Sequence, residues 1–197
     1  MTIEIVPAGT ERVEDLSLLM AHAFVNDPMI RWPLPAAGIE RSTTLMFRWL
    51  LEGYADIGFL WQAVEPTGKA VGCAAWLPPG RSQELERVDR ASRPRIAELT
   101  DDGGARYDTL WDWIEEKIPD EPVWFLDMIA VEEVARGTGV GSALLRFGLE
   151  RARADGVPAF LETARPDNVA MYEHFGFRVV DESDAPGGGP HLWFMST

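Results

Sequence analysis

The sequence predicts a single α/β domain over residues 1–197, and three observations lead to this fold class. Residues 124–163 contain an apolar run of strand length, a glycine-rich turn, an amphipathic helical stretch and a second apolar run, which is the order of a βαβ crossover. Residues 59–65 and 70–77 are strand-like runs around a Pro-Thr-Gly turn, which is typical of a β-hairpin. Residues 78–120 are helical and charged, and we expect an insertion between two strands, because the segment is too short to bury its own core.

The remaining elements follow from apolar periodicity and from turn residues. Thr10 is suited to the N-cap of the first helix, and the segment Asn-Asp-Pro at 26–28 ends that helix. Within the insertion, a face at i, i+3, i+4, i+7 spacing from Tyr107 to Ile114 is interpreted mainly as packing. Strands are also expected at 3–6, 124–131, 158–164, 177–181 and 191–195, and helices at 10–24, 39–55 and within 82–118.

The segment Arg-Gly-Thr-Gly-Val-Gly at 136–141 predicts an anion-binding loop at a helix start. Alternate glycines allow positive φ and let a ligand approach the main chain. Their N–H groups and the helix dipole suit a phosphate, and Arg136 adds a two-pronged cation. A purely steric role for the glycines is the alternative.

Two common phosphate motifs do not fit this loop. A P-loop needs Lys and then Ser or Thr after its last glycine, whereas Gly141 is followed by Ser142 and Ala143. In the dinucleotide fingerprint the third glycine comes one residue later than Gly141 does here. That fingerprint usually lies in the first βα unit, whereas this segment lies in the second half of the chain.

The segment IAVEEVARGTGVGSALL resembles the acyl-CoA-binding motif of the GCN5-related N-acetyltransferase (GNAT) family, in which Arg or Gln precedes x-x-G-x-G after a strand. The segment NVAMYEHFGF at 168–177 is similar to the N-x-x-x-x-Y-x-x-x-G-F element of that family, with one residue fewer between Asn and Tyr. DIGFLWQAVEP, EPVWFLDMIAV and GVPAFLETARPDN resemble the puromycin-acetylating branch. The resemblance covers most of the chain and is weakest from 78 to 119.

This resemblance implies the GNAT acyl-CoA N-acyltransferase fold, a mixed central sheet with helices on both faces. In that family two central strands separate near the glycine loop, and acetyl-CoA enters the gap. The implied cofactor contacts are the pantetheine on the β-strand main chain and the pyrophosphate on the loop. The corresponding residues are Met128, Ile129, Ala130, Val131, Arg136, Gly137, Thr138, Gly139, Val140, Gly141, Ser142 and Asn168.

The resemblance also implies direct attack of an unprotonated amine on the thioester. A main-chain N–H near Met128 or Ile129 would stabilise the oxyanion, and Tyr172 would protonate the leaving thiolate with an ordinary pKa of about 10. The alternative for Tyr172 is a half-buried aromatic residue with a hydrogen-bonded hydroxyl. Glu162 lies in an apolar strand, where a carboxylate is costly unless paired or functional, and it could take the amine proton directly or through water. An outward-facing Glu162 is the alternative.

The expected acceptor is a small-molecule primary amine, with an antibiotic or aminonucleoside of the puromycin kind as a candidate. Asp27 and Trp32 lie in the segment FVNDPMIRWPLP, which corresponds to an acceptor-wall loop in the family, although the Asn-Asp pair favours a cap or turn role for Asp27. Two other functions stay open. One is acetylation of a different amine or of a protein N-terminus, and the other is acyl-CoA sensing without turnover.

Composition disfavours several other classes. The net charge of −14 argues against nucleic acid and is compatible with a cationic substrate. One cysteine and three histidines offer no metal cluster, and a single Cys73 is consistent with a reducing cytoplasm. No apolar run approaches the ~20 residues of a membrane span, and the N-terminal segment lacks the pattern of a secretory leader. We therefore expect a cytoplasmic monomer or homodimer with no metal, membrane or nucleic acid partner.

Overall fold

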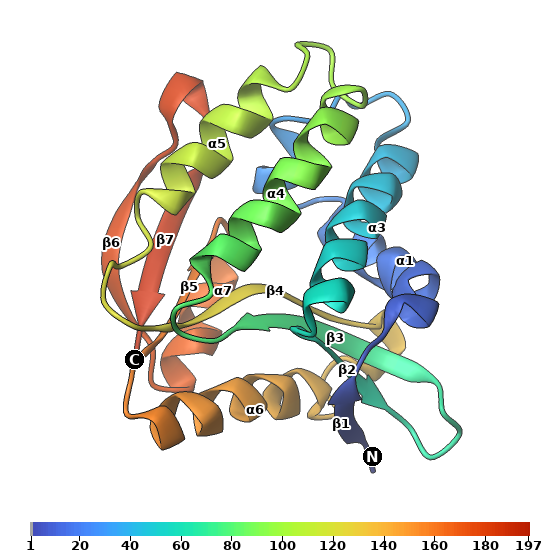
Figure 1. The fold of residues 1–197 in the computed structure, drawn as a ribbon, viewed down its shortest axis with the longest axis vertical. Helices are drawn as coiled ribbons and strands as arrows, with labels where there is room; N and C mark the ends of the chain where they lie inside the picture. Colours follow the sequence, from blue (N-terminus) through green and yellow to red (C-terminus); the bar gives the residue numbers. More distant parts are fainter. Residues whose placement is uncertain (1) are drawn as a thin grey trace.

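The computed structural model describes residues 2–197, which form one seven-stranded mixed β-sheet with helices on both faces (Figure 1). All neighbouring strands pair antiparallel except β4 and β5, which are parallel. The predicted α/β class and the βαβ crossover are confirmed. In sheet order the strands are β1 (Glu4–Pro7), β2 (Leu60–Val64), β3 (Ala70–Leu77), β4 (Trp124–Val131), β5 (Ala159–Thr163), β7 (His191–Ser196) and β6 (Arg178–Asp184).

Four of the helices cover one face of the sheet, and α6 covers the other (Figure 1). The four are α1 (Val13–Phe24), α3 (Ile39–Ile57), α4 (Ser82–Ala97) and α5 (Ala105–Glu115). Helix α6 is Val140–Asp155, and α7 (Pro166–His174) follows β5. Shorter elements are α2 (Pro28–Arg31) and the 3-10 turns η1 (Thr10–Arg12), η2 (Glu133–Ala135) and η3 (Pro186–Gly188).

Helix α2 is not predicted by the sequence pattern. Pro28 was expected only to end the preceding helix, but it occupies the first turn of a new one. Proline suits this position because its missing N–H would have no helical partner there. Asp27 is the N-cap, and its Oδ1 accepts a hydrogen bond from the Met29 N–H at 2.9 Å.

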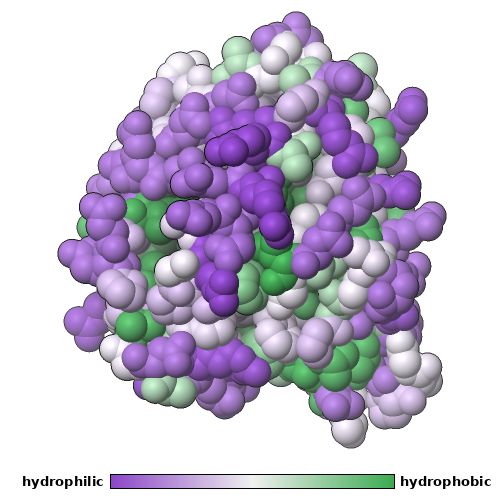
Figure 2. Space-filling model, in the orientation of Figure 1, coloured by the Kyte–Doolittle hydropathy of each residue, from purple (hydrophilic) through white to green (hydrophobic). Residues whose placement is uncertain are grey.

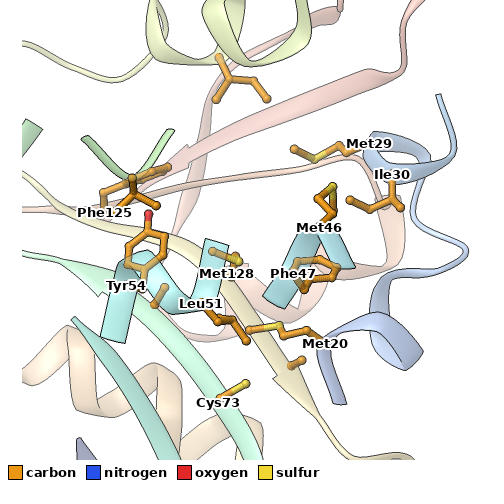
Figure 3. Packing of buried hydrophobic residues seen from close by; sticks show 14 of the residues in the cluster. Met20, Met29, Ile30, Met46, Phe47, Leu51, Tyr54, Cys73, Phe125 and Met128 are labelled. Atoms are coloured by element: carbon orange, nitrogen blue, oxygen red, sulfur yellow. The ribbon is translucent and has the colours of Figure 1, made fainter. Parts of the chain in front are cut away.

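Two hydrophobic cores lie on opposite sides of the sheet. The larger one packs α1, α3, α4 and α5 against β3, β4 and β5, and Figure 3 shows part of it around Met46, Leu51 and Phe125. The smaller one lies beneath α6. A Cβ at Gly148 would lie 2.1 Å from the Trp76 ring, so only glycine lets α6 approach the sheet this closely.

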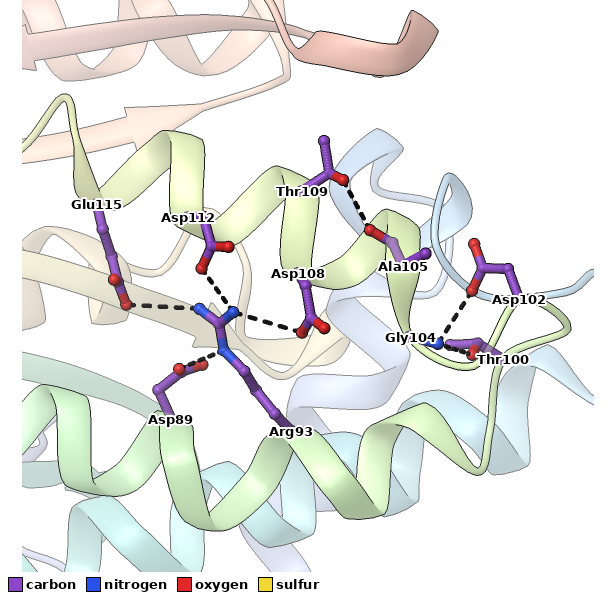
Figure 4. A network of polar contacts seen from close by, with 10 residues as sticks. All are labelled: Asp89, Arg93, Thr100, Asp102, Gly104, Ala105, Asp108, Thr109, Asp112 and Glu115. Carbon is purple, nitrogen blue, oxygen red and sulfur yellow. Dashed lines mark hydrogen bonds and ion pairs between the residues drawn. The ribbon is translucent and has the colours of Figure 1, made fainter.

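The insertion between β3 and β4 is helical, as expected. Helix α4 packs beside α3, and α5 reaches across to β7, where the Trp113 and Phe194 rings meet edge to face at 5.4 Å. The two insertion helices are joined by Arg93 of α4, which contacts acidic side chains of both helices (Figure 4). The insertion therefore packs on the same core as α1 and α3.

The central strands β4 and β5 pair over only three residues. The register runs from Trp124 opposite Ala159 to Leu126 opposite Leu161, and it ends there. Beyond this point β4 continues to Val131, paired only with β3 on its other side. The main-chain groups on the β5 side of that segment therefore form a free edge, as the predicted separation of the strands requires.

Candidate active site

A cavity with about 1060 Å³ of empty space, part of it open to solvent, lies beside the separated ends of β4 and β5. Its walls come from β4, β5, α7 and helices α1 to α5, and they are mainly apolar and aromatic. Five carboxyl groups also line it, whereas no Lys, Arg or His of residues 2–197 does so. The five belong to Asp27, Asp89, Glu115, Asp127 and Glu162.

Asp127 reaches this cavity because β4 is bulged. Leu126 lies opposite Trp76 and Met128 lies opposite Ala75, so Asp127 is an extra residue with no partner on β3. A bulge re-aims side chains and shifts the alternation of the strand, and both Asp127 and Met128 consequently line the cavity. Burial raises the pKa of the Asp127 carboxyl from 3.8 to about 6. The nearby charges of Asp89 and Glu115 raise it further.

Glu162 lies at the first position of β5 beyond the β4 pairing and lines the cavity. The sequence alternative, an outward-facing residue, is wrong: its Oε2 is buried and has no hydrogen-bond partner in residues 2–197. Burial raises the pKa of this carboxyl well above its usual value, and the charges of Asp127 and Asp27 raise it further. A buried, unpaired carboxyl group of this kind is suited to accepting a proton or binding a cation.

Tyr172 lies on α7 and is 5% exposed, with its ring edge to face against Phe177 at 5.8 Å. It lines the same cavity as Glu162. The ordinary pKa expected for Tyr172 is wrong. Burial raises the pKa of its hydroxyl above 10, and the charges of Glu162 and Asp27 add to the rise. This hydroxyl is therefore a hydrogen-bond donor that does not ionise readily.

Asn168 lies one turn before Tyr172 and also lines the cavity. Its Nδ2 donates to the Oγ1 of Thr163 at 3.2 Å, which ties α7 to the end of β5. The main-chain N–H of Arg165 donates to the same hydroxyl at 3.3 Å. These bonds fix the start of α7, and with it the position of Tyr172 relative to Glu162.

Of the two residues expected to contact the acceptor amine, Asp27 lines the cavity and Trp32 does not. Asp27 is buried, lines the cavity and caps α2, so its capping role is confirmed, and its contact with the acceptor stays a prediction. Burial raises the pKa of its carboxyl, and the Met29 N–H and Arg165 oppose the rise. Trp32 does not line the cavity. It packs near η3, where a Cβ at Gly187 would lie 3.7 Å from its ring.

The glycine loop lies between β4 and α6. Gly137 and Gly139 have φ of 76° and 95°, values that favour glycine strongly, and nothing lies within 4 Å of a Cβ at either position. The first helical hydrogen bond of α6 runs from the Ala143 N–H to the Gly139 carbonyl at 3.0 Å. The preceding N–H groups of the first turn therefore point outward without a helical partner, as an anion site requires.

Arg136 is exposed at the edge of this loop, and its Nε donates to the Val131 carbonyl at 3.3 Å. That contact holds the guanidinium between the end of β4 and the start of α6. The residues present therefore fit a long anionic thioester cofactor. The free edge of β4 offers main-chain partners, and the loop offers N–H donors and a cation.

Several cavity residues were not identified from the sequence. Asp127 sits in the apolar run WFLDMIAV, where its isolated charge was the available signal. Tyr54 belongs to a broad apolar helix face, and its buried hydroxyl has no hydrogen-bond partner in residues 2–197. The sequence predicts mainly a packing role for Tyr107, but this residue also lines the cavity. Asp89 and Glu115 of the insertion line it as well. Which helix faces meet a cavity depends on tertiary packing, so periodicity could not single these residues out.

The sequence matches the Acetyltransferase (GNAT) family over residues 26–177, a span that contains β4, the glycine loop, β5 and α7. The chain belongs to the GNAT family. It is an acetyltransferase of the GNAT type, and the GNAT fold binds acetyl-CoA.

Similar proteins support this family. An uncharacterized N-acetyltransferase of Schizosaccharomyces pombe is 23% identical over 80% of this chain and 67% of that protein. A crystal structure described as histone acetyltransferase HPA2 and related acetyltransferase, from Corynebacterium glutamicum, is 26% identical. That match covers 100% of this chain and 96% of the other, with a TM-score of 0.75. A Drosophila melanogaster polyamine N-acetyltransferase has the same fold, with 12% identity, a TM-score of 0.60, and coverage of 100% and 99%.

The described residues show neither a metal-binding group nor a membrane-spanning helix. Among residues 2–197, no group of three or more His, Cys, Asp or Glu residues is arranged to hold a metal ion, although five carboxyl groups line one cavity. The same residues include no helix with the length and apolar character that crossing a membrane requires.

Proposed function

We propose that the protein transfers the acetyl group of acetyl-CoA to the primary amine of a small molecule, with Glu162 as the base and Tyr172 as the acid. One observation carries this proposal. Glu162 and Tyr172 line the same cavity at the point where β4 and β5 separate, next to the free edge of β4.

Acetyl-CoA supplies the acetyl group as a reactive thioester. The main chain from Met128 to Val131 would hold its pantetheine arm, and the loop from Arg136 to Ser142 would bind its pyrophosphate. Asn168 would add a side-chain amide at the start of α7. A free N–H of β4 near Ile129 would stabilise negative charge on the carbonyl oxygen.

The acceptor amine reaches the cavity as an ammonium ion, which five carboxyl groups attract. An ordinary carboxylate is a poor base for an ammonium ion, because their pKa values differ by about six units. The raised pKa of Glu162 narrows that difference, so burial makes proton transfer from the ammonium less unfavourable. The bound cation offsets the repulsion between Glu162 and its acidic neighbours and so lowers the pKa of Glu162 enough to ionise it, while burial keeps part of the raised pKa.

Tyr172 would donate its proton towards the sulfur that leaves. The raised pKa of its hydroxyl weakens it as an acid, since proton transfer to a thiolate is then no longer balanced. A cation in the cavity offsets the carboxylate charges that raise this pKa, so the hydroxyl becomes a better donor when the acceptor is present.

The resemblance to the puromycin-acetylating branch makes puromycin one candidate acceptor. The aromatic walls of the cavity support an acceptor with a ring, and the absence of any described basic side chain in its lining argues against an anionic one. The alternative, acyl-CoA binding without turnover, is disfavoured because Glu162 and Tyr172 are both placed in the cavity.

The test is a panel of amines with acetyl-CoA, with release of free thiol as the readout. We expect turnover with at least one cationic small-molecule amine. Glu162→Gln should lower kcat/KM about 10²-fold or more while the affinity for acetyl-CoA stays unchanged. Glu173→Gln, an exposed change on α7 beside Tyr172, is the matched control and should have no effect. Binding of acetyl-CoA without thiol release for any amine would show a sensor instead of an enzyme.

A further inference from the structure

The acidic lining of the cavity extends well beyond the proposed catalytic pair. Glu162 and Asp27 lie at its inner end, beside Tyr172. Asp89 of α4 and Glu115 of α5 belong to the insertion and line the opposite wall. Asp127 lies between the two groups, because its charge acts on Glu162 while those of Asp89 and Glu115 act on Asp127. With one ammonium ion at Glu162, the carboxyl groups of Asp89 and Glu115 would have only the Arg93 guanidinium as an ion-pair partner among residues 2–197.

The charges of the insertion are strongly unbalanced. Arg93 donates to Asp89 and to Asp112, the latter at 2.6 Å, and it lies 3.4 Å from Asp108 and 3.8 Å from Glu115 (Figure 4). Within residues 2–197 these four carboxylates have no other ion-pair partner. One guanidinium shared by four carboxylates leaves a net negative charge on this part of the insertion, and two of the four, Asp89 and Glu115, line the cavity. Charges of one sign along a cleft attract and hold ligands of the opposite sign.

An independent observation points to a ligand in this region. Tyr54 is 1% exposed and lines the cavity, yet its hydroxyl makes no hydrogen bond of normal geometry with any residue from 2 to 197. In Figure 3 its ring extends from α3 with the hydroxyl oxygen directed away from the helix. Buried hydroxyl groups are rarely left without a partner. This one faces the Asp127 carboxyl, and its oxygen can accept a hydrogen bond from a cation bound there.

The wall between the two acidic groups is apolar and aromatic. Phe47, Val88 and Met128 line it, and so do Tyr107 and Trp111, whose ring centroids are 5.7 Å apart. Apolar side chains can pack against the methylene groups of a ligand, and aromatic faces stabilise cations. Figure 2 shows hydrophilic side chains dominating the outer surface of this face, with hydrophobic surface visible between them.

We propose that the acceptor carries a second cationic group, an ammonium or a guanidinium, separated from the reacting amine by an apolar chain or ring. The reacting amine lies at Glu162, and the second cation lies among Asp127, Asp89 and Glu115, with the Tyr54 hydroxyl as an additional acceptor. The insertion thereby selects diamines and related dications over monoamines. This inference rests on the proposed acetyltransferase function of the same cavity.

The test compares pairs of amines that differ only in the second cation. Cadaverine and pentylamine form one pair, and putrescine and butylamine form another. At saturating acetyl-CoA, kcat/KM for the diamine should exceed that for the monoamine by about tenfold or more, as expected for a cation bound by partly buried carboxylates. The advantage should shrink as the salt concentration rises, because part of the outer site is exposed.

Glu115→Gln is the informative variant, because Glu115 contacts Arg93 only at 3.8 Å and its loss disturbs the insertion least. It should raise KM for cadaverine about fivefold to tenfold while leaving pentylamine unchanged. Asp112→Asn is the matched control. It removes the same charge from the same helix, but Asp112 does not line the cavity, so both amines should keep their rates.

Two results would overturn the inference. The first is equal kcat/KM for diamine and monoamine, and the second is an equal loss for both amines in Glu115→Gln. If the proposed acetyltransferase function itself is wrong, no amine will cause release of free thiol from acetyl-CoA. That outcome differs from both results above. In that event cadaverine should still raise the melting temperature more than pentylamine does, and Glu115→Gln should remove the difference. Equal thermal shifts would reject the second cation site as well.

Discussion

Replacing Asp127 by Asn should stabilise the folded protein at neutral pH, because the carboxyl is ionised in surroundings that disfavour its charge. Its pKa rises from 3.8 to about 6 on folding, a shift of about two units. One unit corresponds to about 1.4 kcal/mol, so the ionised carboxyl lowers the free energy of unfolding by at most about 3 kcal/mol. The increase in melting temperature should therefore be a few degrees, and about 10 °C at most.

The direction of the pH dependence follows from proton binding. Between pH about 4 and pH about 6 the folded protein holds the Asp127 proton more tightly than the unfolded chain does. The contribution of Asp127 to the free energy of unfolding therefore falls across this window as the pH rises, and the Asn variant lacks that loss. The difference between the two proteins should be small near pH 4, grow up to about pH 6 and then stay constant.

Urea unfolding of both proteins at a series of pH values measures this difference directly. Asp181→Asn is the control of opposite sign, because Lys117 donates to Asp181 at 2.6 Å and holds its pKa below the usual value. Stability from that contact is present at neutral pH and is lost on acidification. A pH-independent difference for Asp127→Asn, or a variant less stable than the wild type at pH 8, would refute the reasoning.

Three further changes test other parts of the site. Tyr172→Phe should slow turnover by roughly 10²- to 10⁴-fold with acetyl-CoA but much less with an acyl donor whose thiol leaves without a proton, and equal losses would retire the acid role. Ser142→Asp should weaken acetyl-CoA binding about tenfold or more by calorimetry, because it places a negative charge beside the pyrophosphate site. The neutral Ser142→Asn should not do so, and neither change should destabilise the first turn of α6. Gly148→Ala should destabilise the protein by about 1–3 kcal/mol in chemical unfolding, because the new Cβ would overlap the Trp76 ring, and an unchanged midpoint would contradict this packing.

The local part of the site was predictable from the sequence because short-range geometry determines it. The spacing of Gly137 and Gly139 requires positive φ, and both glycines adopt it at the start of α6. Asn168 and Tyr172 are four residues apart on one helix, and both line the cavity. Periodicity also placed the strands and the longer helices, since each buries one face against its neighbour.

Positions that depend on the partner strand were not predictable. Strict alternation along β4 would place Asp127 and Met128 on opposite faces, and the segment contains no glycine or proline to indicate a bulge. The bulge arises from the register with β3, which a single strand cannot reveal. The expectation of an ordinary pKa for Tyr172 failed for a similar reason, because burial and the charges of Glu162 and Asp27 depend on packing.

The sequence alone therefore determined the βαβ unit, the glycine loop at the start of α6 and the resemblance to the GNAT family, since each depends on residues close together in the chain. The tertiary structure decided the composition of the cavity. Its five carboxyl groups come from the segment before α2, from α4, α5, β4 and β5, and they converge only when the insertion folds over the separated strands. Side chains this far apart in sequence interact through space, and their shared charge, which we expect to select the acceptor, exists only in the folded protein.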